Sequence, residues 1–85
     1  MDKVLVEVHC AAVSKSYDFW IPKKMRISKV IEKMVSDISQ YELNNELFNY
    51  ERQIFMYFYE QRIFLNPDQT VEEAGIVSGI RLMII

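Results

Sequence analysis

The fold is decided by the stretch Leu65–Ile85, which reads LNPDQTVEEAGIVSGIRLMII. A strand ends at Leu65, Asn66-Pro67-Asp68 predicts a turn, and a short helical turn follows from Thr70. The apolar run over 80–85 predicts a final strand. This stretch therefore predicts a turn and a short helical turn that lead into a final, buried strand.

Two glycines separate the helical turn from the final strand. Gly75 and Gly79 can take the positive φ that tight turns require, whereas Ile76 and Leu82 supply apolar side chains for the core. The spacing thus combines turn residues with core residues.

The first twenty-two residues predict a hairpin. Val4, Val6 and Val8 alternate with residues of the other face over 3–9, which is the period of a half-buried strand. Tyr17, Phe19 and Ile21 repeat the alternation after a connection through 14–16, and Pro22, which has no N–H to donate, ends the second strand.

The clearest helix follows this hairpin. Its apolar residues recur at i, i+3, i+4, i+7, i+8 and i+11, which makes one stripe over about four turns. The stripe consists of Ile27, Val30, Ile31, Met34, Val35 and Ile38. A hairpin this small needs a helix over its apolar face, so we expect the stripe to be core.

The middle of the chain is less regular. Residues 39–53 have partial helical spacing weakened by three asparagines, which predicts a loop with one or two helical turns. Residues 54–59 and 62–65 then predict two short strands joined by a turn at Glu60-Gln61.

The order is strand, strand, helix, strand, short strand, helical turn, strand, which indicates an α+β fold. The helix supplies the long crossover that parallel pairing of the first and last strands needs. In this order the chain resembles ubiquitin-like β-grasp proteins, in which a mixed sheet of four to five strands packs on one main helix. Among them it is most similar to the bacterial YukD/EsaB family of type VII secretion loci.

The resemblance spans nearly all of 1–85, taken as a single domain. Its specific parts are 27–34 and 70–82, in which 75–82 is similar to the Gly-Ile-x-x-Gly-x-x-Leu of that family. The chain departs from the compact pattern by about ten extra residues between Ile38 and Ile54. The resemblance implies a protein of a type VII (WXG100-associated) secretion system.

Composition excludes several classes. Cys10 is the only cysteine, so no intramolecular disulfide forms, and we expect a reducing, cytoplasmic location. The start of the chain shows no signal peptide and no apolar run reaches membrane-span length. A net charge of −2 with acidic residues dominating after Met34 disfavours nucleic acid as a partner.

The chain offers little for chemistry. His9 and Cys10 are two potential ligands without a cluster to complete a metal site, and His9 is the only histidine. Two glycines cannot build a phosphate-cradling loop. We therefore expect no enzyme activity, no cofactor and no metal. Cys10 is expected to be a small packing residue.

Strand alternation predicts an apolar outer sheet face. If the first and last strands bury Val4 and Leu82, then Leu5, Met83 and Ile85 point away from the helix, as does Trp20. The third strand contributes either Met56 and Phe58 or the set Phe55, Tyr57 and Tyr59, and parity favours the first set. We therefore predict a protein-binding surface of Leu5, Met56, Phe58, Met83 and Ile85. The alternative is that 39–53 cover this face as a second core.

A basic cluster around the helix start is the second candidate surface. It comprises Lys23, Lys24, Arg26, Lys29 and Lys33, with Glu32 as the only acid among them. These charges oppose the helix dipole, and selection for an acidic partner would explain them. The other interpretation is a solvated basic face.

The function implied by the resemblance is a non-catalytic adaptor or regulator that binds secretion machinery or its regulators. Without a C-terminal Gly-Gly, conjugation to targets is not expected, although a modifier or sulfur carrier is an alternative. Further alternatives are a ubiquitin-like interaction domain of a larger protein and a homodimerising β-grasp protein of another pathway, since one apolar face serves either partner.

Overall fold

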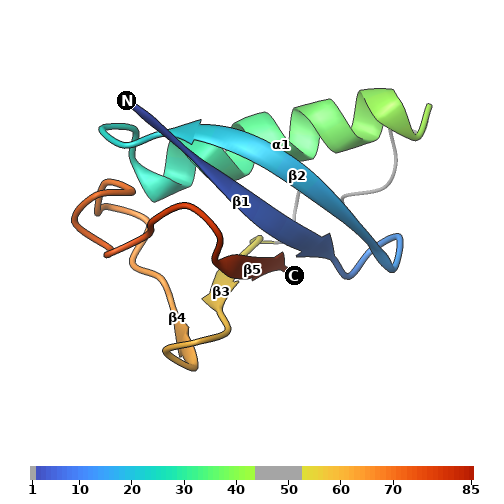
Figure 1. Cartoon of the computed structure of the whole chain (residues 1–85). Helices are drawn as coiled ribbons and strands as arrows, with labels where there is room; N and C mark the ends of the chain where they lie inside the picture. Colours follow the sequence, from blue (N-terminus) through green and yellow to red (C-terminus); the bar gives the residue numbers. More distant parts are fainter. Residues whose placement is uncertain (1, 44–52) are drawn as a thin grey trace.

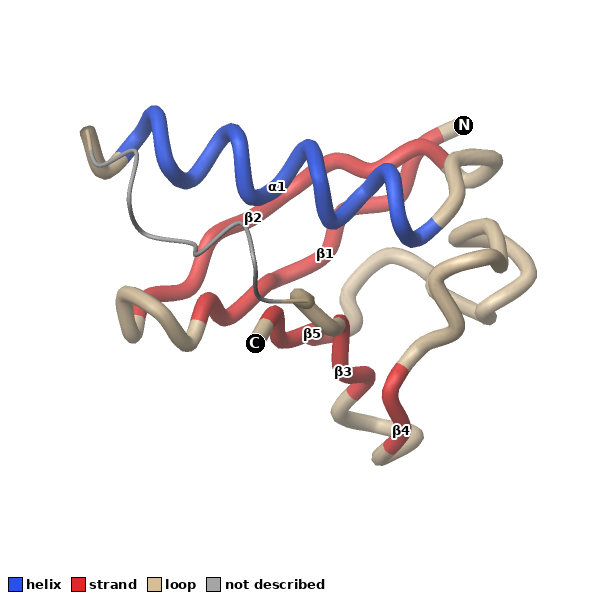
Figure 2. The backbone as a smooth tube through the Cα atoms, turned by 180° about the vertical axis from the view of Figure 1, so that it is seen from behind, coloured by secondary structure: helices blue, strands red, loops and turns tan. Residues whose placement is uncertain are grey.

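The structure is a computed structural model that describes residues 2–43 and 53–85. Five strands and one helix form two layers, with the helix lying across one face of the sheet (Figures 1 and 2). The elements are β1 (Lys3–Cys10), β2 (Lys15–Pro22), α1 (Ile27–Tyr41), β3 (Met56–Phe58), β4 (Ile63–Phe64) and β5 (Arg81–Ile84). The predicted α+β fold with one main helix is confirmed.

The sheet has the order β2-β1-β5-β3-β4. β1 pairs with β5 in parallel, and every other pair is antiparallel. The first and last strands are therefore adjacent, as predicted, and α1 is the crossover that brings the chain back to a parallel register.

One boundary differs from the sequence prediction. α1 continues three residues beyond Ile38, so 39–41 belong to the main helix and not to the predicted loop with one or two helical turns of its own. Of the rest of the predicted loop, 44–52 lie outside the described residues. Over 71–75 the chain makes turns, and the N–H of Ala74 donates to the carbonyl of Thr70 at 3.0 Å, which agrees with the short helical turn predicted from Thr70.

The core lies between α1 and the sheet. Ile27, Val30, Met34 and Ile38 of the predicted stripe are each 1% exposed or less. They pack against the inner side chains of β1 and β5, including Val8 and Leu82, which are fully buried. Truncating such a residue to alanine costs about 2–5 kcal/mol, so this layer supplies most of the stability of a chain this small.

The segment before β5 caps α1. No side chain caps the helix at Arg26; instead the N–H groups of Ile27 and Ser28 donate to the carbonyls of Gln69 and Pro67 at 2.8 and 3.0 Å. These backbone carbonyls accept hydrogen bonds from N–H groups that have no partner within the helix. The turn that follows β4 therefore holds the start of α1 in place.

A reciprocal capping box stabilises the next turn. The N–H of Glu73 donates to Thr70 Oγ1 at 3.1 Å, and the N–H of Thr70 donates to Glu73 Oε1 at 2.9 Å. Hydrogen bonding of the Glu73 carboxyl to Thr70, first to its backbone N–H and then to its side chain, holds the pKa of this carboxyl below its usual value. Gly75 and Gly79 then take φ values of +77° and +94°, as their turn positions predicted.

Candidate functional site on the outer sheet face

The face of the sheet opposite α1 carries the candidate site. Pairing register places five outward side chains in one row across all five strands: Ser16, His9, Met83, Tyr57 and Phe64. The row is polar at β2 and β1 and apolar from β5 to β4. The apolar side chains of this face therefore gather at the β3–β4 edge.

Phe55 and Ile85 extend this apolar region beyond the ends of β3 and β5. Each donates its N–H to the other's carbonyl at 3.0 Å, so the two residues face each other across the continued pair. Both side chains are exposed, by 46% for Phe55 and 37% for Ile85. We call the set Phe55, Tyr57, Phe64, Met83 and Ile85 the aromatic patch.

Aromatic contacts order the patch. The Phe64 ring lies 5.2 Å from Tyr57 and 6.0 Å from Phe55 between centroids, in edge-to-face geometry in both cases. Tyr57 also meets Tyr59 at 5.6 Å. Phe64 remains 57% exposed despite these contacts. The rings are thus positioned relative to each other while their outer surfaces stay accessible.

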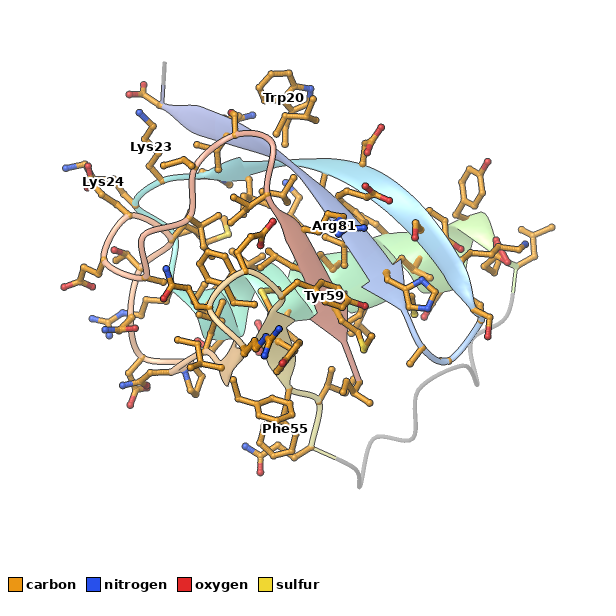
Figure 3. The ribbon with its side chains drawn as sticks, turned by 60° about the horizontal axis from the view of Figure 1, so that its bottom comes forward. Trp20, Lys23, Lys24, Phe55, Tyr59 and Arg81 are labelled. Carbon is orange, nitrogen blue, oxygen red and sulfur yellow. The ribbon has the colours of Figure 1, made fainter. Side chains whose placement is uncertain are left out.

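Charged side chains border the patch. Asp18, Glu7 and Arg81 form the next row of the face, and the Arg81 guanidinium lies 5.6 Å from the centroid of the Tyr59 ring. A hollow of about 260 Å³ lies beside them and includes His9. Figure 3 shows Arg81 and Tyr59 between Phe55 at one end of the face and Trp20 at the other.

The charged row divides the predicted apolar surface. Leu5 lies opposite Trp20 in the β1–β2 pair, on the far side of Glu7 and Arg81 from the aromatic patch. Leu5 is half-buried and Trp20 is 51% exposed. The predicted outward direction of Leu5, Met83 and Ile85 is confirmed, but the structure places Leu5 in a separate apolar corner.

The predicted placement of Met56 and Phe58 is wrong. They are 1% and 4% exposed and belong to the core. Met56 pairs with Ile84 and Phe58 with Leu82, and residues directly opposite each other share a face, so the buried side chains of β5 bring both inward. The alternative set is the outer one.

A chemical signal favoured that alternative set. Tyr57 and Tyr59 carry hydroxyls, whereas Met56 and Phe58 have no polar atom to satisfy in a core, so the phenols are better suited to the water-facing side. Phe64 was missed altogether, because a two-residue strand has too short a pattern to show its face.

The predicted basic cluster does not form one surface. Lys24 and Lys29 lie 4.0 and 3.3 Å from the carboxylates of Glu72 and Glu32, and the Arg26 guanidinium donates to the carbonyl of Asp68 at 3.0 Å. Arg26, Lys29 and Lys33 share a shallow depression beside the start of α1. Lys23 lines a different hollow, described below.

His9 and Cys10 point to opposite faces of the sheet. His9 Nδ1 lies 3.2 Å from Ser16 Oγ on the outer face. Cys10 is fully buried, and burial raises the pKa of its thiol. Two side chains on opposite sides of one sheet cannot act on one substrate, so they do not make a catalytic dyad. Within 2–43 and 53–85, no three His, Cys, Asp or Glu side chains gather at metal-binding distance.

Comparisons with known proteins support the fold strongly. No protein-family model and no curated protein matches the chain. Among solved structures, the ubiquitin-like domain of the Mycobacterium tuberculosis type VII secretion system protein EccD1 is similar. It has a TM-score of 0.73 and 17% identity, and the match covers 100% of this chain and 99% of that one.

Two further structures are equally informative. A chain of an ESX-5 inner membrane complex matches with a TM-score of 0.79 and 16% identity, over 100% of this chain and 21% of that one. A structure described as molecular mimicry of SUMO that promotes DNA repair matches with a TM-score of 0.78 and 10% identity, over 100% and 92%. The chain has a ubiquitin-like fold, similar to the EccD domains among others.

Within the described ranges, no helix has the length and apolar character needed to cross a membrane.

Proposed function

We propose that this chain is a non-catalytic, protein-binding adaptor or regulator of a bacterial type VII secretion system that acts in the cytoplasm. Two observations support the proposal. The fold is similar to the ubiquitin-like domains of EccD proteins, and the resemblance to the YukD/EsaB family lies in 27–34 and 70–82.

The aromatic patch is the observation that carries the binding role. Two phenylalanines and an isoleucine stay more than a third exposed on a rigid sheet, next to half-buried Tyr57 and Met83. Contiguous exposed apolar side chains of this kind mark interaction sites on soluble proteins. Aromatic residues and methionine are also the side chains enriched at protein interfaces.

The border of the patch suits a protein partner as well. Glu7 and Arg81 lie beside it in the charged row, and rim charges steer association and fix register more than they add affinity. The depression beside the start of α1, lined by Arg26, Lys29 and Lys33, then binds acidic segments of the same or another partner. This assignment extends the sequence prediction of a basic surface.

The chemistry of the described residues fits binding without catalysis. Cys10 is buried on the inner face of the sheet and His9 lies on the outer face, so this thiol and this imidazole do not form a nucleophile–base pair. We propose that the protein acts by non-covalent binding and forms no covalent conjugates.

One alternative has specific support. The ESX-5 chain is matched over only 21% of its length, so in that protein the similar region is a part of a larger chain. The same region could serve in this way here, as an interaction domain of a longer protein. Its aromatic patch would then dock onto neighbouring domains of one assembly.

The test uses the tagged protein in a host that carries a type VII secretion locus. Crosslinking, affinity capture and mass spectrometry identify its partners for the wild type and for Phe64→Asp. Ile63→Asp is the matched control, because Ile63 adjoins Phe64, is 49% exposed and points to the opposite face. Circular dichroism verifies that all three proteins are folded.

Capture of secretion ATPase or membrane subunits, lost in Phe64→Asp and kept in Ile63→Asp, supports the proposal. Recovery of proteins joined through isopeptide bonds contradicts it and indicates a modifier. Capture of the chain alone, with a dimer in sedimentation, indicates a homodimerising protein of another pathway.

A further inference from the structure

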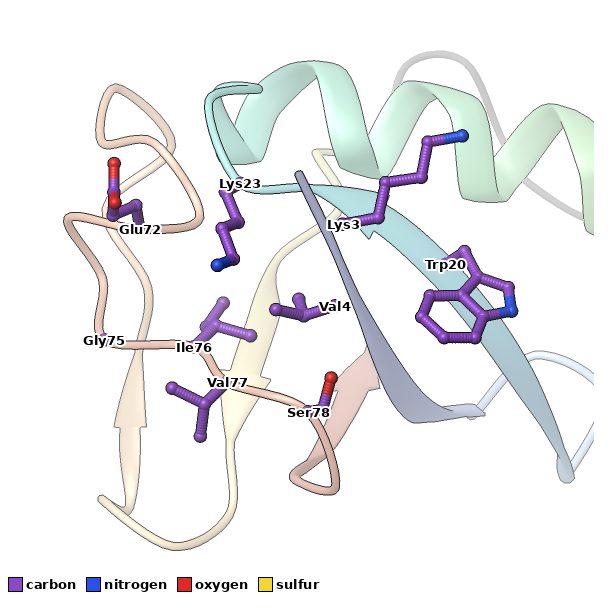
Figure 4. A pocket seen from close by; sticks show the side chains of 9 residues that line it. All are labelled: Lys3, Val4, Trp20, Lys23, Glu72, Gly75, Ile76, Val77 and Ser78. Atoms are coloured by element: carbon purple, nitrogen blue, oxygen red, sulfur yellow. The ribbon is translucent and has the colours of Figure 1, made fainter. Parts of the chain in front are cut away.

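A second hollow, of about 430 Å³, lies where β1 begins and β2 ends. It is at the corner of the sheet away from the aromatic patch, and the segment leading into β5 forms its other wall (Figure 4). Its apolar lining comes from Val4, Trp20, Ile76 and Val77.

The lining combines a buried floor with exposed walls. Val4 and Ile76 are 4% and 3% exposed and belong to the core, whereas Trp20 and Val77 are 51% and 58% exposed. Covering two large apolar side chains of this kind is favourable, because water then leaves both surfaces. The hollow therefore suits an apolar side chain of a ligand.

Hydrogen bonds hold the walls in place before any ligand binds. The N–H of Glu72 donates to the carbonyl of Lys23 at 2.9 Å, and the N–H of Lys23 donates to the carbonyl of Asp2 at 2.8 Å. On the other side, the N–H of Leu5 donates to Ser78 Oγ at 3.0 Å. A preformed site binds more tightly, because less binding free energy is lost in ordering its residues.

Two lysines line this hollow, Lys3 and Lys23, and the Lys3 ammonium points away from Ile76 (Figure 4). The half-buried Lys23 directs its ammonium into the space in front of Ile76, while the carboxylate of Glu72 points away (Figure 4). Over 2–43 and 53–85, no carboxylate lies within ion-pair distance of Lys23; Glu72 approaches Lys24 instead, at 4.0 Å. An ammonium beside apolar walls interacts more strongly with an anion than one in open water does.

We propose that this hollow binds a peptide in which a carboxylate adjoins a large apolar side chain. The carboxylate meets the Lys23 ammonium, and the apolar side chain lies between Trp20 and Val77. An internal acidic residue followed by leucine and a C-terminal leucine with its free carboxylate both present this chemistry. The site is separate from the aromatic patch and does not depend on the secretion role.

Trp20 provides the readout, because it is the only tryptophan of the chain. Its emission is followed while the purified protein is titrated with capped hexapeptides that contain Glu-Leu or Gln-Leu. A second pair ends in leucine as the free acid or as the amide. We expect a saturable blue shift, with at least one acid binding about fivefold more tightly than its neutral counterpart.

Variants assign the effect to named side chains. Lys23→Gln should abolish the preference for the acid, and Val77→Ser should weaken the binding of acid and neutral peptides alike. Lys33→Gln removes an equal charge on α1 and should leave the preference unchanged, as should Met83→Asp in the aromatic patch.

Three results would overturn the proposal. They are no change in Trp20 emission with any peptide, equal affinity for every acid and its neutral partner, and a preference for the acid that survives in Lys23→Gln. Preference for the internal acid, or for the C-terminal one, identifies which kind of peptide the site accepts. Because only synthetic peptides are used, failure here leaves the test with secretion subunits unaffected.

Discussion

Tyr57 lies directly opposite Met83 in the antiparallel pair of β3 and β5, and both side chains point away from α1. One position further along, Phe58 lies opposite Leu82, and both are buried beneath the helix. A single step along either strand thus changes a residue's environment from accessible surface to core.

Met83→Asp and Leu82→Asp should therefore differ sharply. Leu82 is fully buried, and removing such a side chain costs about 2–5 kcal/mol before the penalty for burying a carboxyl is added. Because small domains have only about 5–15 kcal/mol in total, Leu82→Asp should be unfolded. Met83→Asp should stay folded, with a stability change of about 1 kcal/mol or less.

Circular dichroism and urea titration measure both variants. Leu82→Met, which keeps the position apolar, is the control and should remain folded. A folded Leu82→Asp together with an unfolded Met83→Asp would show that the two faces of β5 have been assigned the wrong way round.

Thr70→Ala tests the capping box before β5. The change removes the Oγ1 that accepts the N–H of Glu73, and loss of a side-chain cap costs about 1 kcal/mol. Thr70→Ser keeps the hydroxyl and should lose less. The free energy of unfolding in urea at neutral pH gives both values, and equal stability of the alanine and serine variants would contradict the role of the hydroxyl.

Glu73 makes part of the stability dependent on pH. Its pKa is lowered in the folded protein, so its contribution is present above the carboxyl's ordinary value of 4.5 and is lost as pH falls through the folded pKa. The stability difference between wild type and Glu73→Gln should thus shrink from about pH 5 to pH 3.

Thermal unfolding over this pH range measures the difference. Glu72→Gln is the control, because it removes the same charge one residue earlier without touching Thr70. A difference for Glu73→Gln that stays constant with pH would show that the Thr70 contact does not favour the ionised carboxylate.

The Gly75→Ala variant tests the backbone geometry of the turns over 71–75. A methyl group built there meets no atom within 4 Å, so Gly75→Ala adds no clash and only forces alanine to a φ of +77°. We expect a loss of about 1 kcal/mol, which corresponds to roughly 4–8 °C in Tm for a domain of this size. Gly75→Asn should lose less, because asparagine tolerates this conformation better. Equal losses for the two variants would point to a cause other than φ.

Cys10 should be unreactive in the folded protein. It is fully buried and its pKa is raised by burial, so little thiolate is present and reagents cannot reach it. Ellman's reagent should label it at the rate of unfolding under native conditions and rapidly in denaturant. Because no other cysteine is present, the signal belongs to this residue alone. Rapid labelling without denaturant would contradict its place in the core.

The long, strongly periodic segments could be predicted from the sequence. The Ile27–Ile38 stripe and the alternation over 3–9 match the buried faces of α1 and β1, because burial on one side of a regular element leaves a period in the sequence. The short third strand could not be assigned in this way. Met56, Tyr57 and Phe58 are all large and apolar in body, so either face would fit.

The candidate site was predictable only in outline. The outward direction of Leu5, Met83 and Ile85 followed from alternation, whereas their grouping did not. Leu5 is separated from Met83 by Glu7 and Arg81 because of how β1 pairs with β5, and Phe64 joins the patch because of how β4 pairs with β3. Such groupings depend on strand pairing and leave no local pattern in the sequence.

The sequence by itself determined the α+β class, the order of the elements and the glycine turns before β5, because these follow from periodicity and backbone preference within short segments. Only the tertiary structure decided which side of β3 is buried, that the aromatic patch gathers at the β3–β4 edge, and that Lys23 faces an apolar hollow with Trp20. These features depend on strand register, which is set by the packing of the whole core rather than by any one segment.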